Sequence, residues 1–107
     1  MHARVARFEG VDTARLDEDY EQFRQMLRSQ EPPEGMPAGV AETLRADVRR
    51  VLSLADRENA VTLELTFTDD AEAARRVHEA LDSLSPPEGS GKRTSVGTYE
   101  LMLDEQL

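Results

Sequence analysis

The chain contains no cysteine and no tryptophan. The lack of cysteine excludes a disulfide framework, a thiolate nucleophile and a cysteine-based metal site. The two histidines, His2 and His78, lie far apart and have no ligand-like spacing. We therefore expect no bound metal and no other cofactor.

Long hydrophobic runs are also missing. The first ten residues, MHARVARFEG, hold no apolar stretch long enough for a signal peptide. No later segment approaches the ~20 apolar residues that a membrane-spanning helix needs. We expect a cytoplasmic protein that has no membrane partner.

Positive charge is scarce as well, because 13 basic residues face 22 acidic ones and the net charge is −9. A strongly negative chain is repelled by phosphate backbones, and no stretch interleaves arginine with aromatic residues. We therefore expect no nucleic-acid partner.

A chain of 107 residues fits one domain, residues 1–107, with a modest core. Its charged fraction is 33%, above the roughly 25% that is typical of globular domains. An interface with a second copy would help such a chain to bury enough apolar surface.

The clearest element is AVTLELTFT (Ala60–Thr68), whose strict alternation predicts a strand. One face of this strand carries Val61, Leu63, Leu65 and Phe67, and the other carries Thr62, Glu64 and Thr66. Asp69 and Glu72 have the spacing of a capping box, which predicts a helix from there to about Leu84. We expect the apolar face of the strand to contact the helices.

The first half follows a similar plan, with a strand at His2–Gly10 and a helix that Asp12 or Thr13 caps. The apolar residues of this helix recur at helical spacing and are Leu16, Tyr20, Phe23 and Leu27. The motif PPEG occurs at Pro32–Gly35 and at Pro86–Gly89. We expect each copy to end a helix and to lead into a strand, the second of these strands being Ser95–Leu103.

The segment Val40–Asp56 allows two interpretations. Its apolar spacing slightly favours one helix, and the alternative is a helical turn at Val40–Asp47 followed by a strand at Val48–Ala55. In the second case DREN (Asp56–Asn59) is the turn of a hairpin with Ala60–Thr68. We favour the second because it completes a βαββαβ order.

This order is the ferredoxin-like split βαβ topology of the α+β class: a four-stranded antiparallel sheet with two helices on one face. The stretches HARVARFEG, PEGMPAG, RVLSLADRENAVTLELTF and SVGTYELML resemble small bacterial proteins of the antibiotic-biosynthesis-monooxygenase type, the dimeric α+β barrels. The sequence departs from this family at Ala38–Val48, where the relatives pass straight into the second strand.

The resemblance implies a homodimer in which the bare faces of two sheets enclose a barrel. The function that we expect is binding of a small apolar or aromatic metabolite there. The alternative is a cofactor-independent monooxygenase or isomerase that acts on an aromatic, polyketide-like or quinol-like metabolite. Family members that degrade haem or oxidise polyphenols rely on Trp, Asn and His, whereas this chain lacks Trp and has Asn59 in a predicted turn.

The candidate cavity residues lie on the polar side of the central strands and are Arg4, Thr62, Glu64 and Thr66. A buried Glu64 is the natural base for the alternative function, unless it pairs with Arg4 on the neighbouring strand or is simply solvated. The catalytic residues are otherwise unknown. His78 is a weaker candidate base, and the aromatic residues Phe8, Phe67 and Tyr99 are expected in the core.

Overall fold

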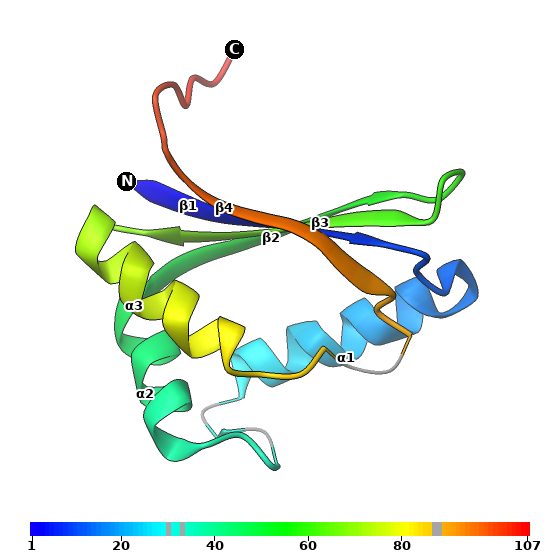
Figure 1. Cartoon of the computed structure of the whole chain (residues 1–107), viewed down its shortest axis with the longest axis horizontal. Helices are drawn as coiled ribbons and strands as arrows, with labels where there is room; N and C mark the ends of the chain where they lie inside the picture. Colours follow the sequence, from blue (N-terminus) through cyan, green and yellow to red (C-terminus); the bar gives the residue numbers. More distant parts are fainter. Residues whose placement is uncertain (30, 33, 87–88) are drawn as a thin grey trace.

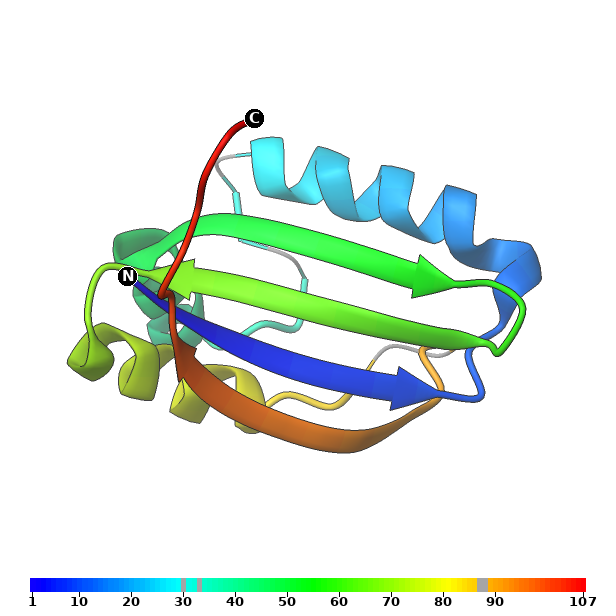
Figure 2. The same ribbon diagram turned by 90° about the horizontal axis from the view of Figure 1, so that it is seen from above.

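The structure, a computed structural model, describes residues 1–29, 31–32, 34–86 and 89–107. Its strands are β1 (His2–Glu9), β2 (Val48–Asp56), β3 (Val61–Thr68) and β4 (Lys92–Glu100), and its helices are α1 (Leu16–Arg28), α2 (Ala38–Asp47) and α3 (Ala71–Asp82). The strands form an antiparallel sheet in the order β2-β3-β1-β4 (Figure 2). This is the expected ferredoxin-like α+β fold, and all three helices lie on one side of the sheet (Figure 1).

The segment with two interpretations contains both a helix and a strand. The strand β2 is confirmed and pairs with β3. The helical turn expected at Val40–Asp47 is a full helix, α2, which begins two residues earlier and ends at the same residue, so the fold has a third helix besides the two expected over the sheet. In the hairpin turn, the Asp56 side chain accepts hydrogen bonds from the backbone and side-chain nitrogens of Asn59.

The start of α3 differs by one residue from the prediction. Asp70, not Asp69, is the N-cap, and its side chain accepts a hydrogen bond from the Ala73 amide at 2.8 Å. Asp69 instead forms an ion pair with Arg49 at 3.0 Å. At α1 the prediction is confirmed, since Asp12 caps a short 3₁₀ turn (Thr13–Arg15) that leads into the helix.

The two PPEG copies follow helices, as predicted, although each helix ends four positions before the first proline of its copy. Residues 33, 87 and 88 of these motifs, and also residue 30, lie outside the described residues. The glycine of each copy has a positive φ, +84° at Gly35 and +87° at Gly89. The second copy leads towards β4, whereas the first leads into α2 and not directly into a strand, as we had expected.

The last strand lies three residues earlier than predicted. β4 pairs with β1, and its final residue Glu100 is opposite His2, the first residue of β1. Beyond this point the partner strand has ended, and one further hydrogen bond joins the Leu101 amide to the Met1 carbonyl. Residues 101–107 leave the sheet on the side opposite the helices (Figure 1).

The core lies between α3 and the sheet. Val77 is fully buried, and the small side chains of Ala6, Ala73 and Ala74 allow α3 to approach the strands closely. α1 has one buried residue, Leu16, and is therefore packed less tightly. Among the described helices, none combines the length and the apolar character that a membrane crossing requires.

Candidate functional site

The polar face of the sheet lies under the helices, which is the reverse of the prediction. Glu64 accepts a hydrogen bond from the Tyr20 hydroxyl of α1. Arg4, two strand positions away in the register, contacts His78 of α3. Alternation along β3 then places its apolar residues on the face without helices.

All four predicted cavity residues therefore lie on the helix side, away from the face where we expected them. Arg4, Thr62 and Thr66 are buried, and Glu64 is partly buried. The expected Arg4–Glu64 pair is also wrong, because Arg4 is opposite Thr66 and each of the two charged groups has other partners.

Glu64 is held by hydroxyl groups from two elements. Oε1 accepts from Tyr20, and Oε2 accepts from Ser53 of β2 at 2.5 Å. Burial raises the pKa of the Glu64 carboxyl, and the two hydroxyl donors offset part of this effect. Burial and the nearby carboxylate likewise raise the pKa of Tyr20 to about 12, so its hydroxyl stays protonated at neutral pH.

A groove of about 340 Å³ opens beside this carboxylate, between α1 and β2. It is lined by Tyr20, Phe23, Arg24, Leu27, Val51, Ser53 and Ala55. Its walls are mostly apolar, and the hydroxyls of Tyr20 and Ser53 connect it to Glu64. Such a combination of apolar walls with a few convergent polar groups is typical of small-molecule sites.

Arg4 occupies a second polar cluster on the helix side. Its Nε donates a hydrogen bond to Nδ1 of His78 at 3.2 Å. Burial and the proximity of Arg93 lower the pKa of Arg4, and Asp82 partly compensates. Asp82 itself forms an ion pair with Arg93 at 2.7 Å. The hydrogen-bond partner of His78 is therefore an arginine. A histidine that acts as a general base would instead need a carboxylate to orient its ring.

The opposite side of the sheet has no helix over it, and its centre is apolar, with the charged residues Arg7 and Arg50 beside that centre. We call it the open face; its central residues are Val5, Leu52, Leu54, Leu63, Leu65 and Phe67. Leu65 lies in register with Val5 on one side and with Leu52 on the other, so the three form a continuous row. Leu54 is 53% exposed.

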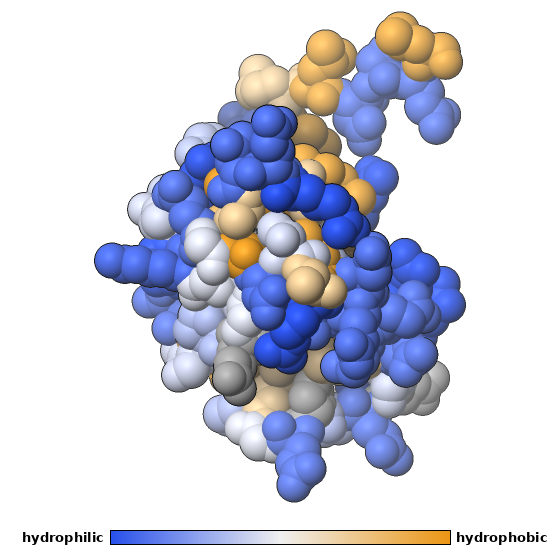
Figure 3. Space-filling view, turned by 90° about the vertical axis from the view of Figure 1, so that its right-hand side faces the viewer, coloured by the Kyte–Doolittle hydropathy of each residue, from blue (hydrophilic) through white to orange (hydrophobic). Residues whose placement is uncertain are grey.

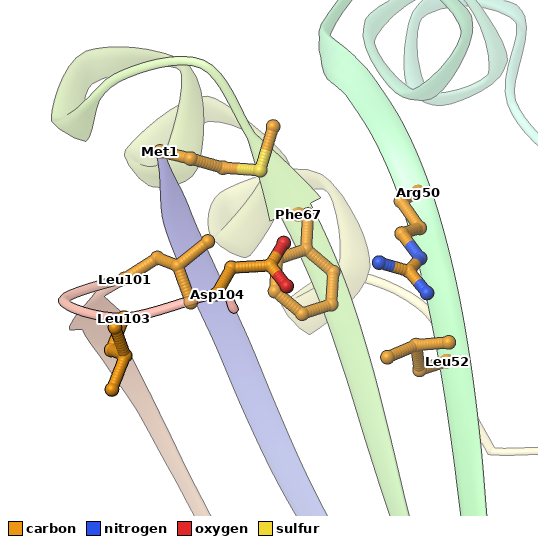
Figure 4. Close-up of a pocket in the computed structure, with 7 residues that line it drawn as sticks. All are labelled: Met1, Arg50, Leu52, Phe67, Leu101, Leu103 and Asp104. Carbon is orange, nitrogen blue, oxygen red and sulfur yellow. The ribbon is translucent and has the colours of Figure 1, made fainter. Parts of the chain in front are cut away.

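A hollow of about 250 Å³ lies at one end of the open face (Figure 4). It is lined by Met1, Arg50, Leu52, Phe67, Leu101, Leu103 and Asp104. In Figure 4, Asp104 of the C-terminal segment lies next to Phe67 of β3, with Leu101 and Leu103 on one side of it and Arg50 and Leu52 of β2 on the other. Figure 3 shows hydrophobic residues along this C-terminal segment and a mostly hydrophilic surface below it.

Two groups of the helix-side site were not predicted. Tyr20 was assigned only to the apolar face of its helix, and Ser53 was not singled out. A tyrosine among apolar helix positions carries a hydroxyl that needs a partner when it is buried, and this is the signal that could have indicated a polar site. Phe67 is buried, as predicted, whereas Tyr99 is 60% exposed and is not a core residue.

Metal-binding geometry was also examined in the described part of the chain. There, no group of three or more histidine, aspartate or glutamate side chains is arranged to hold a metal ion.

These features define an α+β protein with ferredoxin-like strand order, a polar helix-covered sheet face and an apolar open face. Comparison with family models, with curated proteins and with solved structures finds no match.

Proposed function

We propose that the protein is a homodimer in which the open faces of two sheets meet and enclose a space for a small apolar or aromatic metabolite. The observation that carries this proposal is the inverted polarity of the sheet. The polar side chains are already covered by helices, and the side without a covering layer is the apolar one.

The hydrophobic effect favours covering such a face. The central residues of the open face come from three neighbouring strands; Leu54 is exposed, most of the others are partly exposed, and Phe67 is buried, with Arg7 and Arg50 bordering them. A contiguous exposed patch of this kind marks an interaction site in soluble proteins. A second copy offers the same patch in the same shape, and a two-fold axis brings two identical patches together.

The exposed area of the chain also favours a partner. A folded monomer of 12.0 kDa exposes about 6,000 Å² of surface. This chain exposes 7631 Å². The excess is larger than the roughly 800 Å² that each partner buries in an interface of standard size.

The hollow at the end of the open face suggests the kind of ligand. Leucine, methionine and phenylalanine side chains line most of it, and Arg50 and Asp104 point towards each other across it (Figure 4). Two sheets that face each other would extend this apolar lining on both sides of a bound molecule. A small apolar or aromatic compound suits such surroundings, since burial there removes its surface from water.

The alternative function, a cofactor-independent monooxygenase or isomerase, needs a base beside the substrate. Glu64 was the expected base, and it lies on the helix side of the sheet. A ligand held between two open faces would be separated from this carboxylate by the sheet itself. Binding without Glu64 chemistry is therefore the function that we propose.

The proposal is tested with a substitution at the centre of the open face. Leu65→Asp places a charge in the middle of the patch, and desolvation of that charge opposes association. We expect Leu65→Asp to be monomeric by analytical ultracentrifugation and to lose binding of the aromatic probe 2-naphthol, measured by its fluorescence.

The matched control is Ala71→Asp, which adds the same charge at an exposed position of α3 on the helix side. This variant should remain dimeric and should bind 2-naphthol as the unmodified protein does. A dimeric Leu65→Asp that retains probe binding would contradict the proposal.

A further inference from the structure

The groove between α1 and β2 is separate from the open face, because it lies on the helix side of the sheet. The polar residues Tyr20 of α1 and Ser53 of β2 line it, and both donate to the partly exposed carboxylate of Glu64 of β3 directly behind them. What this site would bind follows from the hydrogen-bonding capacity of these three groups and from the charge around them.

Glu64 has a carboxylate that lacks a cationic partner within the described residues. Both of its donors are neutral hydroxyl groups. Each carboxylate oxygen has room for a further hydrogen bond, and the oxygens of Tyr20 and Ser53 are acceptors as well. The site is therefore rich in acceptors and holds a negative charge that a bound cation would neutralise.

The apolar walls of the groove determine what kind of ligand body fits beside the charged group. Phe23 and Leu27 of α1 face Val51 and Ala55 of β2 across the groove, and a hydrocarbon or aromatic body fits between them. Arg24 also lines the groove, but its guanidinium is paired with Glu21 at 3.4 Å. The net charge of −9 further favours an approaching cation over an anion.

We propose that this groove binds a small hydrophobic amine, whose ammonium group donates to Glu64 and whose apolar body lies along Phe23 and Val51. A primary ammonium carries three donors, which match the Glu64 carboxylate and the neighbouring hydroxyl oxygens. The rings of Tyr20 and Phe23 add the attraction of aromatic faces for a cation.

The test compares three probes with the same phenyl ring at neutral pH by isothermal titration calorimetry. They are 2-phenylethylamine, 2-phenylethanol and 3-phenylpropanoate. Because a hydrogen bond to a charged group contributes more than a neutral one, the amine should bind at least about tenfold more tightly than the alcohol. The anion should bind most weakly. Equal affinities for amine and alcohol would overturn the proposal.

Substitutions test whether the Glu64 carboxylate causes the preference for the amine over the alcohol. Glu64→Gln should reduce the affinity for the amine about tenfold and leave the affinity for the alcohol nearly unchanged. The control Glu79→Gln removes an exposed carboxylate that is paired with Arg75, and it should change neither affinity. An unchanged amine preference in Glu64→Gln would contradict the proposal.

A measurement on the unmodified protein keeps the test decisive if Glu64→Gln does not fold. In ¹H–¹⁵N spectra, 2-phenylethylamine should shift the amides of Tyr20, Phe23 and Ser53. Shifts confined to the open face, at Leu65 and Phe67, would place the amine in the other site and would overturn this proposal without affecting the one above.

Discussion

Glu64 carries a partly buried carboxylate that is hydrogen-bonded to two hydroxyl groups and not to a cation. Desolvation is the largest influence on it and favours the protonated form, which is why its pKa is raised. Tyr20 and Ser53 stabilise the ionised form, but they do not cancel the effect of burial. This carboxyl group therefore makes the stability of the fold depend on pH.

The direction of that dependence follows from linkage. The folded-state pKa of Glu64 lies above its ordinary value of 4.5, so the folded state holds the proton more tightly than the unfolded state does. The resulting stabilisation is complete below pH 4.5 and is lost as the pH rises through the folded-state pKa. We predict that the difference in unfolding free energy, unmodified protein minus Glu64→Gln, decreases from pH 4 to pH 7.

Urea unfolding of both proteins across this pH range measures the difference. Glu64→Gln removes the titrating group while other carboxylates remain, so their contributions cancel in the comparison. A difference that grows with pH would mean that the Glu64 pKa is lowered, not raised.

The cap of α3 gives a second prediction for single residues. Asp70→Ala removes the acceptor for the Ala73 amide and should lower the unfolding free energy by about 1 kcal/mol. Asp69→Ala removes only an exposed ion pair with Arg49 and should cost less than about 0.5 kcal/mol. Chemical unfolding of both variants shows which aspartate caps α3. A larger loss of unfolding free energy for Asp69→Ala would make Asp69 the cap instead.

At the level of elements, the entry to β4 is constrained by Gly91. This glycine has φ +73°, and an added Cβ would lie 2.2 Å from the Glu9 carbonyl oxygen. Gly10 has a similar φ of +69°, yet an added Cβ there meets no atom within 4 Å. A substitution at Gly10 therefore causes backbone strain alone, whereas a substitution at Gly91 causes both backbone strain and a steric clash.

We predict that Gly10→Ala lowers the unfolding free energy by about 1–2 kcal/mol, the cost of a left-handed conformation for a residue with Cβ. Gly91→Ala should cost at least about 1 kcal/mol more, since β1 and the turn must also move apart. Thermal and urea unfolding of the pair provide the measurement. Equal losses would show that the turn accommodates a methyl group.

The sequence predicts the elements better than their orientation. The alternation along Ala60–Thr68 correctly separates two faces, but period 2 does not say which of them faces the helices. The usual rule places the apolar face inward, and it fails here because the polar side chains find partners on α1 and α3. Those partners, Tyr20 and His78, are distant in the sequence, and only the packed structure brings them to the sheet.

The start of β2 at Val48 is predicted correctly, whereas the bounds of β4 are missed by three residues. The spacing in Val40–Asp56 fits helix throughout, and the switch to β2 at Val48 is decided by pairing with β3. Similarly, the apolar residues of Ser95–Leu103 suggest a strand to its last residue, but β4 ends where its partner β1 has no more residues. Both outcomes depend on the neighbouring strand, which propensity does not include.

For the whole molecule, the polarity of the two sheet faces points to a second layer. Helices cover the polar face, and the apolar face is uncovered along much of its length. The chain also exposes more surface than a monomer of its mass usually does. A dimer formed through the open faces would cover the apolar face and reduce the exposed surface. The second sheet would also enclose the ligand from the other side.

The mass of the particle in solution tests this central claim most directly. Multi-angle light scattering during size-exclusion chromatography, at micromolar concentration and about 0.15 M salt to screen the net negative charge, measures it. We predict a particle of twice the 12.0 kDa chain mass, with no change on dilution within the micromolar range. A particle of the single-chain mass under these conditions would contradict the association of the open faces.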